Sequence, residues 1–325
     1  AIAAGATVIA DARVEKIEAG RDGRVTGAAY IDRMTGVRHR RTADVVVLCG
    51  NGIGTPRLLL LSADANHPNG LANSSDQVGR NLMHHSAAIV DCWVDEPLDS
   101  HMGVINGAQI SEEFAETDTA RGFVNGFTLH SVRHNGAGFQ ALGAHSANRG
   151  PWGAPHHETF RRRFSQGLSI LVVGDDLPNP ENRVTLSDTL VDSSGLPSPK
   201  VVYHLGENDK RLIRYGIERA IEVCKAADGR DITVNDFHHP ELGYQPPTWH
   251  LLGTARMGSD PADSVVNSWH QAWDAPNLFI VDGSSMPTGA AVNPTSTISA
   301  LALRAATKIA AEFTELRKTT RPWSA

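Results

Sequence analysis

The sequence predicts an α/β (α+β) fold, in which part of a Rossmann-like domain is combined with a second domain that has a mainly antiparallel sheet and flanking helices. The stretch VVVLCGNGIGTPR (Val45–Arg57) joins an apolar strand to a helix through three glycines in five positions, as a dinucleotide-binding unit does. Short β-prone runs bounded by turn residues occupy much of the remaining chain. Two helical patterns, Glu207–Ala227 and the segment from Pro294 onward, supply the flanking helices.

The first part of the chain, residues 6–48, is β-rich. Turn signals such as Gly20–Gly23 separate its short β-prone runs, which are Thr7–Ile9, Arg13–Ile17, Val25–Ile31 and Val45–Leu48. After the glycine turn we expect a helix over residues 56–62, with Pro56 at its start.

Residues 88–244 differ from this β-rich part in their sequence pattern. A glycine-rich stretch, residues 136–153, shows no period and predicts a loop. Strands are expected at Ser169–Pro178, Arg183–Asp188 and Lys200–Leu205. The helix predicted over Glu207–Ala227 has one apolar stripe, made of Leu212, Ile213, Ile217, Ala220, Ile221 and Cys224.

The C-terminal helix has a clear start signal. Asn293 is a favoured N-cap residue, and Pro294 suits the first helical position. We therefore expect Asn293 to cap a helix that starts at Pro294.

Composition excludes several classes of protein. The 325 residues are 41% hydrophobic and 20% charged, which is ordinary for a soluble globular protein. The net charge of −6 argues against a nucleic-acid partner, and no apolar run approaches the roughly 20 residues that span a bilayer. Cys49, Cys92 and Cys224 are odd in number and far apart, so they suggest neither a disulfide framework nor a zinc site. We expect buried, reduced thiols and a cytoplasmic protein.

The glycine turn alone is a weak nucleotide signature. The dinucleotide fingerprint is G-x-G-x-x-G with an acidic residue about 20 positions later. Here the third glycine, Gly54, comes one residue early, and the position about 20 residues on is in a polar loop. Three interpretations stay open: a nucleotide site of its own, a tight strand-to-helix connection, or a turn beside a nucleotide that another segment holds.

Several motifs, in a consistent order along the chain, decide between these interpretations. They are QVGRNLMHH (Gln77–His85), NRVTL (Asn182–Leu186), HLLGTARMG (His250–Gly258), NLFIVDGSSMPT (Asn277–Thr288) and NPTST (Asn293–Thr297). Together with Val45–Leu61 they resemble the glucose-methanol-choline (GMC) family of FAD-dependent oxidoreductases. Within that family the chain is most similar to bacterial sugar oxidases and dehydrogenases of the pyranose-oxidase or glycoside-3-oxidase type.

The resemblance implies a domain organisation. Residues 1–87 and 245–325 would form the C-terminal parts of an FAD-binding domain, and residues 88–244 a substrate-binding domain. The family's G-x-G-x-x-G unit is not matched in this chain, which opens Ala1-Ile2-Ala3 without a Met or a signal peptide. We therefore expect an N-terminal polypeptide portion or subunit that carries the FAD fingerprint and packs against residues 1–60.

The resemblance also implies the catalytic pair. Alcohol oxidation by a flavin removes the hydroxyl proton and transfers a hydride to the flavin N5. By residue-by-residue match, His250 is the base and Asn293 its partner. A neutral imidazole, with a reference pKa of about 6.5, accepts a proton near working pH, and a second polar group stabilises the developing alkoxide. Trp249 is the best candidate to stack on a sugar ring.

Cofactor contacts follow from the same match. A helix N-terminus supplies N–H donors and roughly half a positive charge, which suits a reduced flavin ring. The resemblance places three groups of residues around FAD: Asn293, Pro294 and Thr295 at the ring; Asp282 and Gly283 near the ribityl and diphosphate; and Val14, Cys49 and Gly50 as backbone neighbours.

Other functions are open from the sequence. These are an NAD-dependent dehydrogenase that uses Gly50–Gly54, a non-redox lyase built on the flavin site, and a non-catalytic carbohydrate-binding subunit. An electron-acceptor partner is also possible. Adjacent histidines on a strand point to opposite faces, so no metal site is predicted at His84-His85, His156-His157 or His238-His239.

Overall fold

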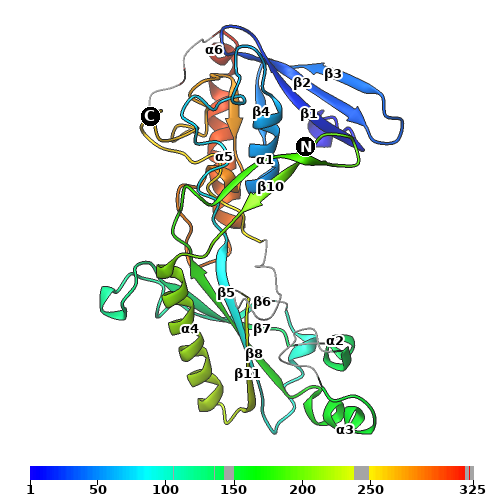
Figure 1. Ribbon diagram of the computed structural model, residues 1–325, viewed down its shortest axis with the longest axis vertical. Coiled ribbons are helices and arrows are strands. Elements are labelled where there is room, and N and C mark those ends of the chain that lie inside the picture. Colours follow the sequence, from blue (N-terminus) through cyan, green and yellow to red (C-terminus); the bar gives the residue numbers. More distant parts are fainter. Residues whose placement is uncertain (105, 135, 143–149, 238–248, 319–321, 323–325) are drawn as a thin grey trace.

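A computed structural model of the chain describes residues 1–104, 106–134, 136–142, 150–237, 249–318 and 322. Figure 1 shows two lobes joined by a narrow middle, through which β5 (His85–Trp93) passes. The fold is a mixture of helices and mostly antiparallel sheets, so the predicted α/β (α+β) class is confirmed.

The upper lobe contains the β-rich start of the chain. β1 (Ala12–Ala19), β2 (Val25–Asp32) and β3 (Arg38–Thr42) form an antiparallel sheet in that order. β4 (Val46–Leu48) instead pairs in parallel with β12 (Leu278–Ile280), which lies more than two hundred residues later in the sequence. The core of the upper lobe contains buried apolar side chains from both ends of the chain, including Ile17, Val25, Leu48, Leu59, Leu278 and Ile280.

The lower lobe is built on an antiparallel sheet with the order β11-β5-β8-β7-β6. The four other strands are β6 (Asn106–Ser111), β7 (Phe127–Val132), β8 (Gly167–Asp175) and β11 (Arg230–Asp236). The predicted amphipathic helix is α4 (Glu207–Ala226), and its apolar stripe packs on this sheet, with Leu212, Ile213, Ala220 and Cys224 buried.

Another antiparallel pair, β9 (Arg183–Val191) and β10 (Pro197–Val202), lies in the upper lobe beside α1 (Asn51–Leu61) (Figure 1). The Arg57 guanidinium on α1 holds this ribbon through the Asp192 carboxylate at 2.8 Å and the Pro197 carbonyl at 2.8 Å. The middle of the sequence therefore contributes to both lobes.

Several predicted element boundaries differ from the structure. The helix expected from Pro56 is α1, which begins five residues earlier at Asn51, so its first turn contains the glycines. Residues 6–9 are not a strand, and β3 was not predicted. The aperiodic stretch 136–153 contains α2 (Ala137–Leu142), and α3 (Ala154–Arg163) follows it. The C-terminal helix is α5 (Thr295–Ala311), followed by α6 (Phe313–Leu316).

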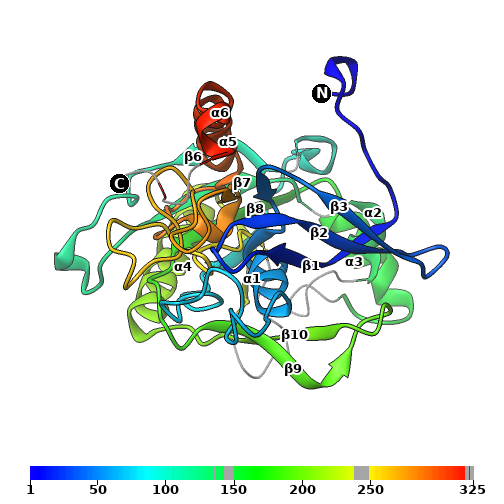
Figure 2. The ribbon, with the colours of Figure 1, turned by 90° about the horizontal axis from the view of Figure 1, so that it is seen from above.

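Exposure corrects one expectation about the thiols. Cys92 and Cys224 are buried as expected, but Cys49 is exposed at the end of β4. The eleven residues before β1 are also exposed and extend away from the body (Figure 2). Across the described part of the chain, no helix combines the length and apolar character needed to cross a membrane.

Candidate active site

The His250–Thr254 segment packs against three other parts of the chain: Asn81–Met83, the first turn of α1 and Gly283. Leu252 and Met83 exchange backbone hydrogen bonds of 3.1 Å in an isolated antiparallel bridge. Gly253 has a φ of +90°, and a Cβ at this position would lie 2.1 Å from the Asn81 carbonyl oxygen. Only glycine therefore fits here, since both the backbone conformation and the close approach exclude a side chain.

The first turn of α1 supports the same segment. Pro56 lies inside α1 and has no N–H, so the Gly52 carbonyl lacks its usual helical donor. The Thr254 hydroxyl donates to that carbonyl at 2.8 Å. A Cβ on Gly52 would lie 2.8 Å from the Leu251 carbonyl carbon, so this glycine provides the close packing.

These contacts hold His250 between two polar side chains. His250 Nδ1 lies 2.6 Å from Nδ1 of His85, and the two rings are 4.7 Å apart, edge to face. On its other side, His250 Nε2 lies 3.3 Å from the amide nitrogen of Asn293. The backbone of His250 has a φ of +55°, which is uncommon for a residue other than glycine. The structure thus brings together His250 and Asn293, which the sequence predicts as a pair.

The environment keeps the imidazoles neutral. Burial lowers the pKa of His250, and the nearby His130 lowers it further. Burial, followed by the effect of His250, lowers the pKa of His85 to about 3, although a backbone contact with Ala290 opposes this shift. Burial also lowers the pKa of His130. At neutral pH the ring of His250 is therefore a proton acceptor.

The remaining neighbours come from the lower lobe. The buried His130 ring lies 2.8 Å, through Nε2, from the Thr128 hydroxyl, which donates to the Ala291 carbonyl two residues before Asn293. This contact fixes the end of the segment that carries Asn293 against β7. The candidate site is therefore assembled from both lobes.

The structure corrects the predicted cap of the C-terminal helix. α5 begins at Thr295, and its N-cap position is Pro294, with no side-chain cap hydrogen bond. Asn293 lies one residue further out, and its side-chain amide is directed at His250 instead. The exposed first turn, Thr295–Thr297, therefore has no side-chain acceptor of the usual capping kind.

The glycine turn of α1 is arranged differently. The Asn51 side chain accepts from the N–H groups of Ile53 and Gly54, and the Asn51 N–H donates to Asp282. The Gly50 N–H donates to the Thr55 hydroxyl at 2.9 Å. Because these donors already have partners within the chain, they are not available to hold a phosphate. This arrangement disfavours an independent NAD site at Gly50–Gly54.

Asp282 connects the N-terminal and C-terminal segments of the chain that form the upper lobe. Its buried carboxylate accepts from the Asn51 N–H at 3.1 Å, from the Thr55 hydroxyl at 2.5 Å and from the Ser284 N–H at 2.8 Å. Gly283 lies beside both Leu251 and Ile298 of α5, since a Cβ added there would be 2.6 Å from the Leu251 oxygen and 3.3 Å from Ile298.

The other predicted residues occupy the surroundings. The Trp249 ring is 38% exposed and lies 6.1 Å from the His250 ring and 5.9 Å from Phe237. Val14, on β1, is 38% exposed. His238 and His239 lie outside the described residues, and within the described ranges no group of His, Cys, Asp or Glu has a metal-binding arrangement.

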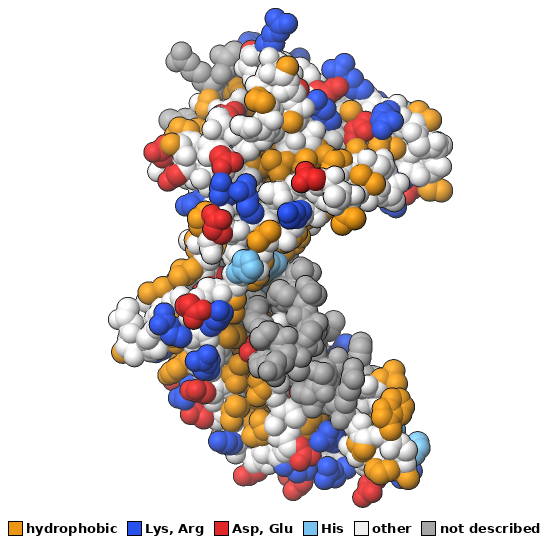
Figure 3. Space-filling model, in the orientation of Figure 1, with side chains coloured by type: hydrophobic (Ala, Val, Ile, Leu, Met, Phe, Trp, Pro, Cys, Tyr) orange, Lys and Arg blue, Asp and Glu red, His pale blue; other side chains and the backbone are white. Residues whose placement is uncertain are grey.

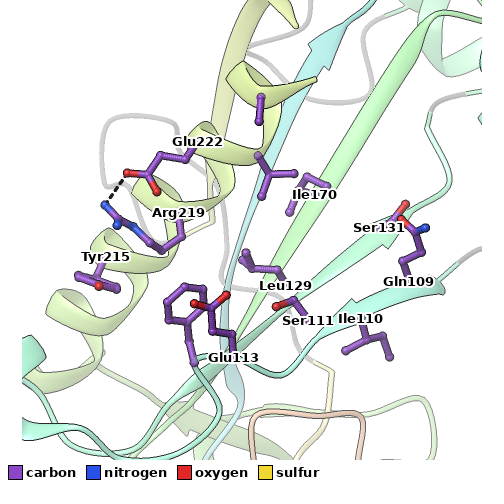
Figure 4. Close-up of a pocket in the computed structure, with 13 residues that line it drawn as sticks. Gln109, Ile110, Ser111, Glu113, Leu129, Ser131, Ile170, Tyr215, Arg219 and Glu222 are labelled. Atoms are coloured by element: carbon purple, nitrogen blue, oxygen red, sulfur yellow. Dashed lines mark ion pairs between the residues drawn. The ribbon is translucent and has the colours of Figure 1, made fainter. Parts of the chain in front are cut away.

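A separate groove lies away from the histidines, between α4 and strands β6, β7 and β8 (Figure 4). Its cavity volume is about 680 Å³, and its wall on α4 carries an ion pair of 2.8 Å between Arg219 and Glu222. None of the residues predicted for the candidate site lines this groove. In Figure 3, exposed histidine side chains are visible at the narrow middle of the molecule and at the edge of the lower lobe.

Sequence reasoning missed the part that His85 and His130 play in this site. His85 belongs to the QVGRNLMHH motif and was considered only as half of a metal pair. Its position within that motif was the available signal. His130 is on a strand with no motif, so only the fold brings it near His250.

Comparisons with known proteins show which family the chain resembles. Two family models, both described as GMC oxidoreductase, match residues 1–87 and 178–302. The chain is 47% identical over 317 residues to a 2-methyl-1,2-propanediol dehydrogenase of Mycolicibacterium austroafricanum, covering 97% of this chain and 56% of that protein. It is 34% identical to the fructose dehydrogenase large subunit of Gluconobacter japonicus, covering 94% of this chain and 54% of the relative. The chain thus spans about half the length of these relatives.

A solved structure shares the fold. Formate oxidase of Aspergillus oryzae superposes with a TM-score of 0.67 at 18% identity, covering 95% of this chain and 62% of that one. At this level of identity the likeness concerns the fold alone.

Proposed function

The chain belongs to the GMC oxidoreductase family, and on this premise we propose that it forms part of an enzyme that oxidises a CH–OH group with FAD. The observation that carries the proposal is the placement of the His250 ring, with Nδ1 at 2.6 Å from His85 and Nε2 at 3.3 Å from the Asn293 amide. Of the described side chains, these provide the base and the polar partner that alcohol oxidation requires.

The geometry supports a separate role for each of the two side chains. His250 Nε2 accepts the hydroxyl proton, and the Asn293 amide donates to the same oxygen as negative charge develops on it. FAD, when bound, supplies the acceptor for the hydride. Trp249, exposed beside His250, is proposed to contact the substrate.

The residues around α5 fit a flavin. The first turn of α5 is exposed and lacks a side-chain cap, so Thr295 and its neighbours can face a negatively charged ring through backbone N–H groups. Gly283 lets the Leu251 backbone pass close beside this turn. We propose that Asn293, Pro294 and Thr295 hold the ring, and that Asp282, Gly283, Cys49, Gly50 and Val14 lie near the rest of the cofactor.

We also propose that residues 1–87 and 245–325 belong to the FAD domain and residues 88–244 largely to the substrate domain, with a further polypeptide portion completing the former. Two observations support a missing partner. In the described residues the strand partner of β4 is β12, and Val47 on β4 is 44% exposed. α5 is rich in apolar residues, yet its Leu303 is 69% exposed and Ala305 alone is buried. We also propose an electron-acceptor partner and a cytoplasmic location.

The relatives' names narrow the substrate class. One is named for 2-methyl-1,2-propanediol and another for fructose. Both compounds carry hydroxyls on adjacent carbons. We propose that the substrate is a vicinal diol of a sugar, a glycoside or a small polyol.

Anaerobic flavin reduction tests this substrate class. 2-Methyl-1,2-propanediol, fructose and a methyl glycoside are each mixed with the flavin-loaded protein, and loss of flavin absorbance is recorded. We expect at least one of them to bleach the flavin. 2-Methyl-1-propanol, which lacks the second hydroxyl, is the matched control and should react at least 10-fold more slowly, since a site built to bond a hydroxyl discriminates against its absence. Equal rates would exclude the diol class, and no bleaching by any compound would contradict the oxidase or dehydrogenase activity.

The pH dependence of this reaction has a definite sign. A base must be neutral to act, so the rate at low substrate concentration is lost as the pH falls through the pKa of His250. Because burial lowers that pKa, the rate should be constant above pH 7 and decline only below the ordinary value of 6.5. Stopped-flow flavin reduction between pH 4.5 and 8 measures it, and a decline that begins above pH 7 would contradict the assignment.

A further inference from the structure

His85 is the first residue of β5, and its ring is completely buried against His250. Its backbone is fixed by the sheet, where it pairs with Asp175 of β8. The next residue, Ser86, donates its N–H to the buried Asp176 carboxylate at 2.7 Å. The ring of His85 is therefore presented to His250 from a rigid strand.

The short distance between the two Nδ1 atoms limits which of them carries a proton. At 2.6 Å, the two Nδ1 atoms share one hydrogen, so one ring donates and the other accepts. The Asn293 amide nitrogen, 3.3 Å from His250 Nε2, is a donor and meets a lone pair there. A neutral imidazole with a lone pair on Nε2 carries its proton on Nδ1. It follows that His250 donates through Nδ1 and that His85 accepts.

We propose that His85 is a positioning residue that selects the Nδ1–H tautomer of His250 and so directs the basic Nε2 toward the substrate. This inference rests on the proposed function of His250 as the base. His85 then carries its own proton on Nε2, which is buried and has no hydrogen-bond partner among the described residues. After His250 accepts a proton on Nε2, its Nδ1–H still donates to the neutral His85, and this hydrogen bond becomes charge-assisted.

Two substitutions of His85 by side chains of similar shape distinguish the loss of the hydrogen-bond acceptor from the loss of ring volume. His85→Asn keeps an oxygen acceptor close to the position of Nδ1, whereas His85→Leu removes it. We expect the Leu variant to reduce flavin about 100-fold more slowly with saturating substrate, and the Asn variant to stay within about 10-fold of the parent protein. The matched control is His84→Leu, because His84 is the adjacent buried histidine and its ring packs on Tyr203, at 4.3 Å, rather than on His250.

A spectroscopic readout tests the tautomer without turnover. The assembled protein is labelled with ¹⁵N-histidine, and the His250 signals are identified by their loss in His250→Gln. In the parent, the Asn variant and the His84 control, His250 should carry its proton on Nδ1; in His85→Leu the two tautomers should mix.

The outcomes are distinguishable. A proton on Nε2 of His250 in the parent protein, or equal behaviour of the Leu and Asn variants, would overturn the role of His85. An equal loss in the His84 control would show that removing any buried histidine here is sufficient, and would also overturn it. If no substrate reduces the flavin, the proposed function fails, while the spectra still decide the tautomer.

Discussion

His250→Ala will slow flavin reduction by substrate by about 10²- to 10⁴-fold while FAD stays bound, because removing a general base costs about this much. The ring of His250 projects between His85 and Asn293, and truncating it leaves no other described imidazole in contact with the Asn293 amide. The backbone that carries it is held independently by the Leu252–Met83 bridge and by the Thr254 hydroxyl, so the fold should persist. Stopped-flow absorbance measures the reduction rate, and the flavin spectrum of the purified variant reports cofactor retention.

Two controls separate proton transfer from general damage. His39→Ala removes an exposed histidine on β3 of the same lobe and should leave the rate unchanged. Added imidazole should restore part of the rate to His250→Ala, since the cavity left by the ring admits a free base, whereas it should not affect the parent protein. A variant that reduces flavin at a near-normal rate, or one that loses FAD entirely, would sink the assignment of His250 as the base.

The sequence was informative where local pattern determines local structure. The apolar stripe of α4 and the apolar run of β8 predict those elements because burial on one or both faces is visible as periodicity. α3 was missed for the same reason, since its sequence, APHHETFRRR, buries no residue and so has no stripe to detect. Helices that stay on the surface are specified by propensity alone, which is a weak signal.

The start of α1 shows a different limit. Pro56 resembles a first-turn proline, which placed the helix start too late. In the structure the helix begins at Asn51, whose N–H is bonded to Asp282, 231 residues away in the sequence. The Gly52 carbonyl that Pro56 leaves free is bonded by Thr254, 202 residues away in the sequence. A helix start that depends on contacts this remote is not visible in a local window of sequence.

The candidate site was predictable in part, and only through the family's motifs. They led to His250 and Asn293, which the fold brings within 3.3 Å. The interpretation of Asn293 as a cap rested on helix-start statistics and was wrong, because a nearby imidazole competes for its side chain. His85 was considered only as a poor metal ligand, since its contact with His250 spans 165 positions and depends on the register of β5 with β8.

Gly253→Ala will destabilise the protein by about 2–4 kcal/mol, the range expected when positive-φ strain is combined with a steric clash. The new Cβ would lie 2.1 Å from the Asn81 carbonyl oxygen, and the φ of +90° is one that side-chain-bearing residues rarely adopt. The oxygen cannot move away freely, because the neighbouring Leu82 N–H is bonded to the Asn182 carbonyl at 2.9 Å and Gly79 is bonded to Thr254 at 2.8 Å. Urea unfolding measures the loss as a lower midpoint at constant slope.

Substitutions at two other glycines distinguish backbone strain from the steric clash as causes of the lost stability. Gly36 has a φ of +74° but no atom within 4 Å of an added Cβ, so Gly36→Ala tests strain alone and should cost about 1 kcal/mol. Gly54 lies in α1 with open space and no positive φ, and Gly54→Ala should be neutral or stabilise by up to about 1 kcal/mol. If Gly253→Ala costs no more than Gly36→Ala, the close approach to Asn81 contributes nothing. If Gly253→Ala costs more stability than Gly36→Ala, the close approach to Asn81 contributes to the fold. The rate of flavin reduction in the Gly253→Ala variant then shows whether the position of His250, three residues away, depends on the same approach. A shift of about 1 Å at a reacting group lowers the rate by about 100-fold.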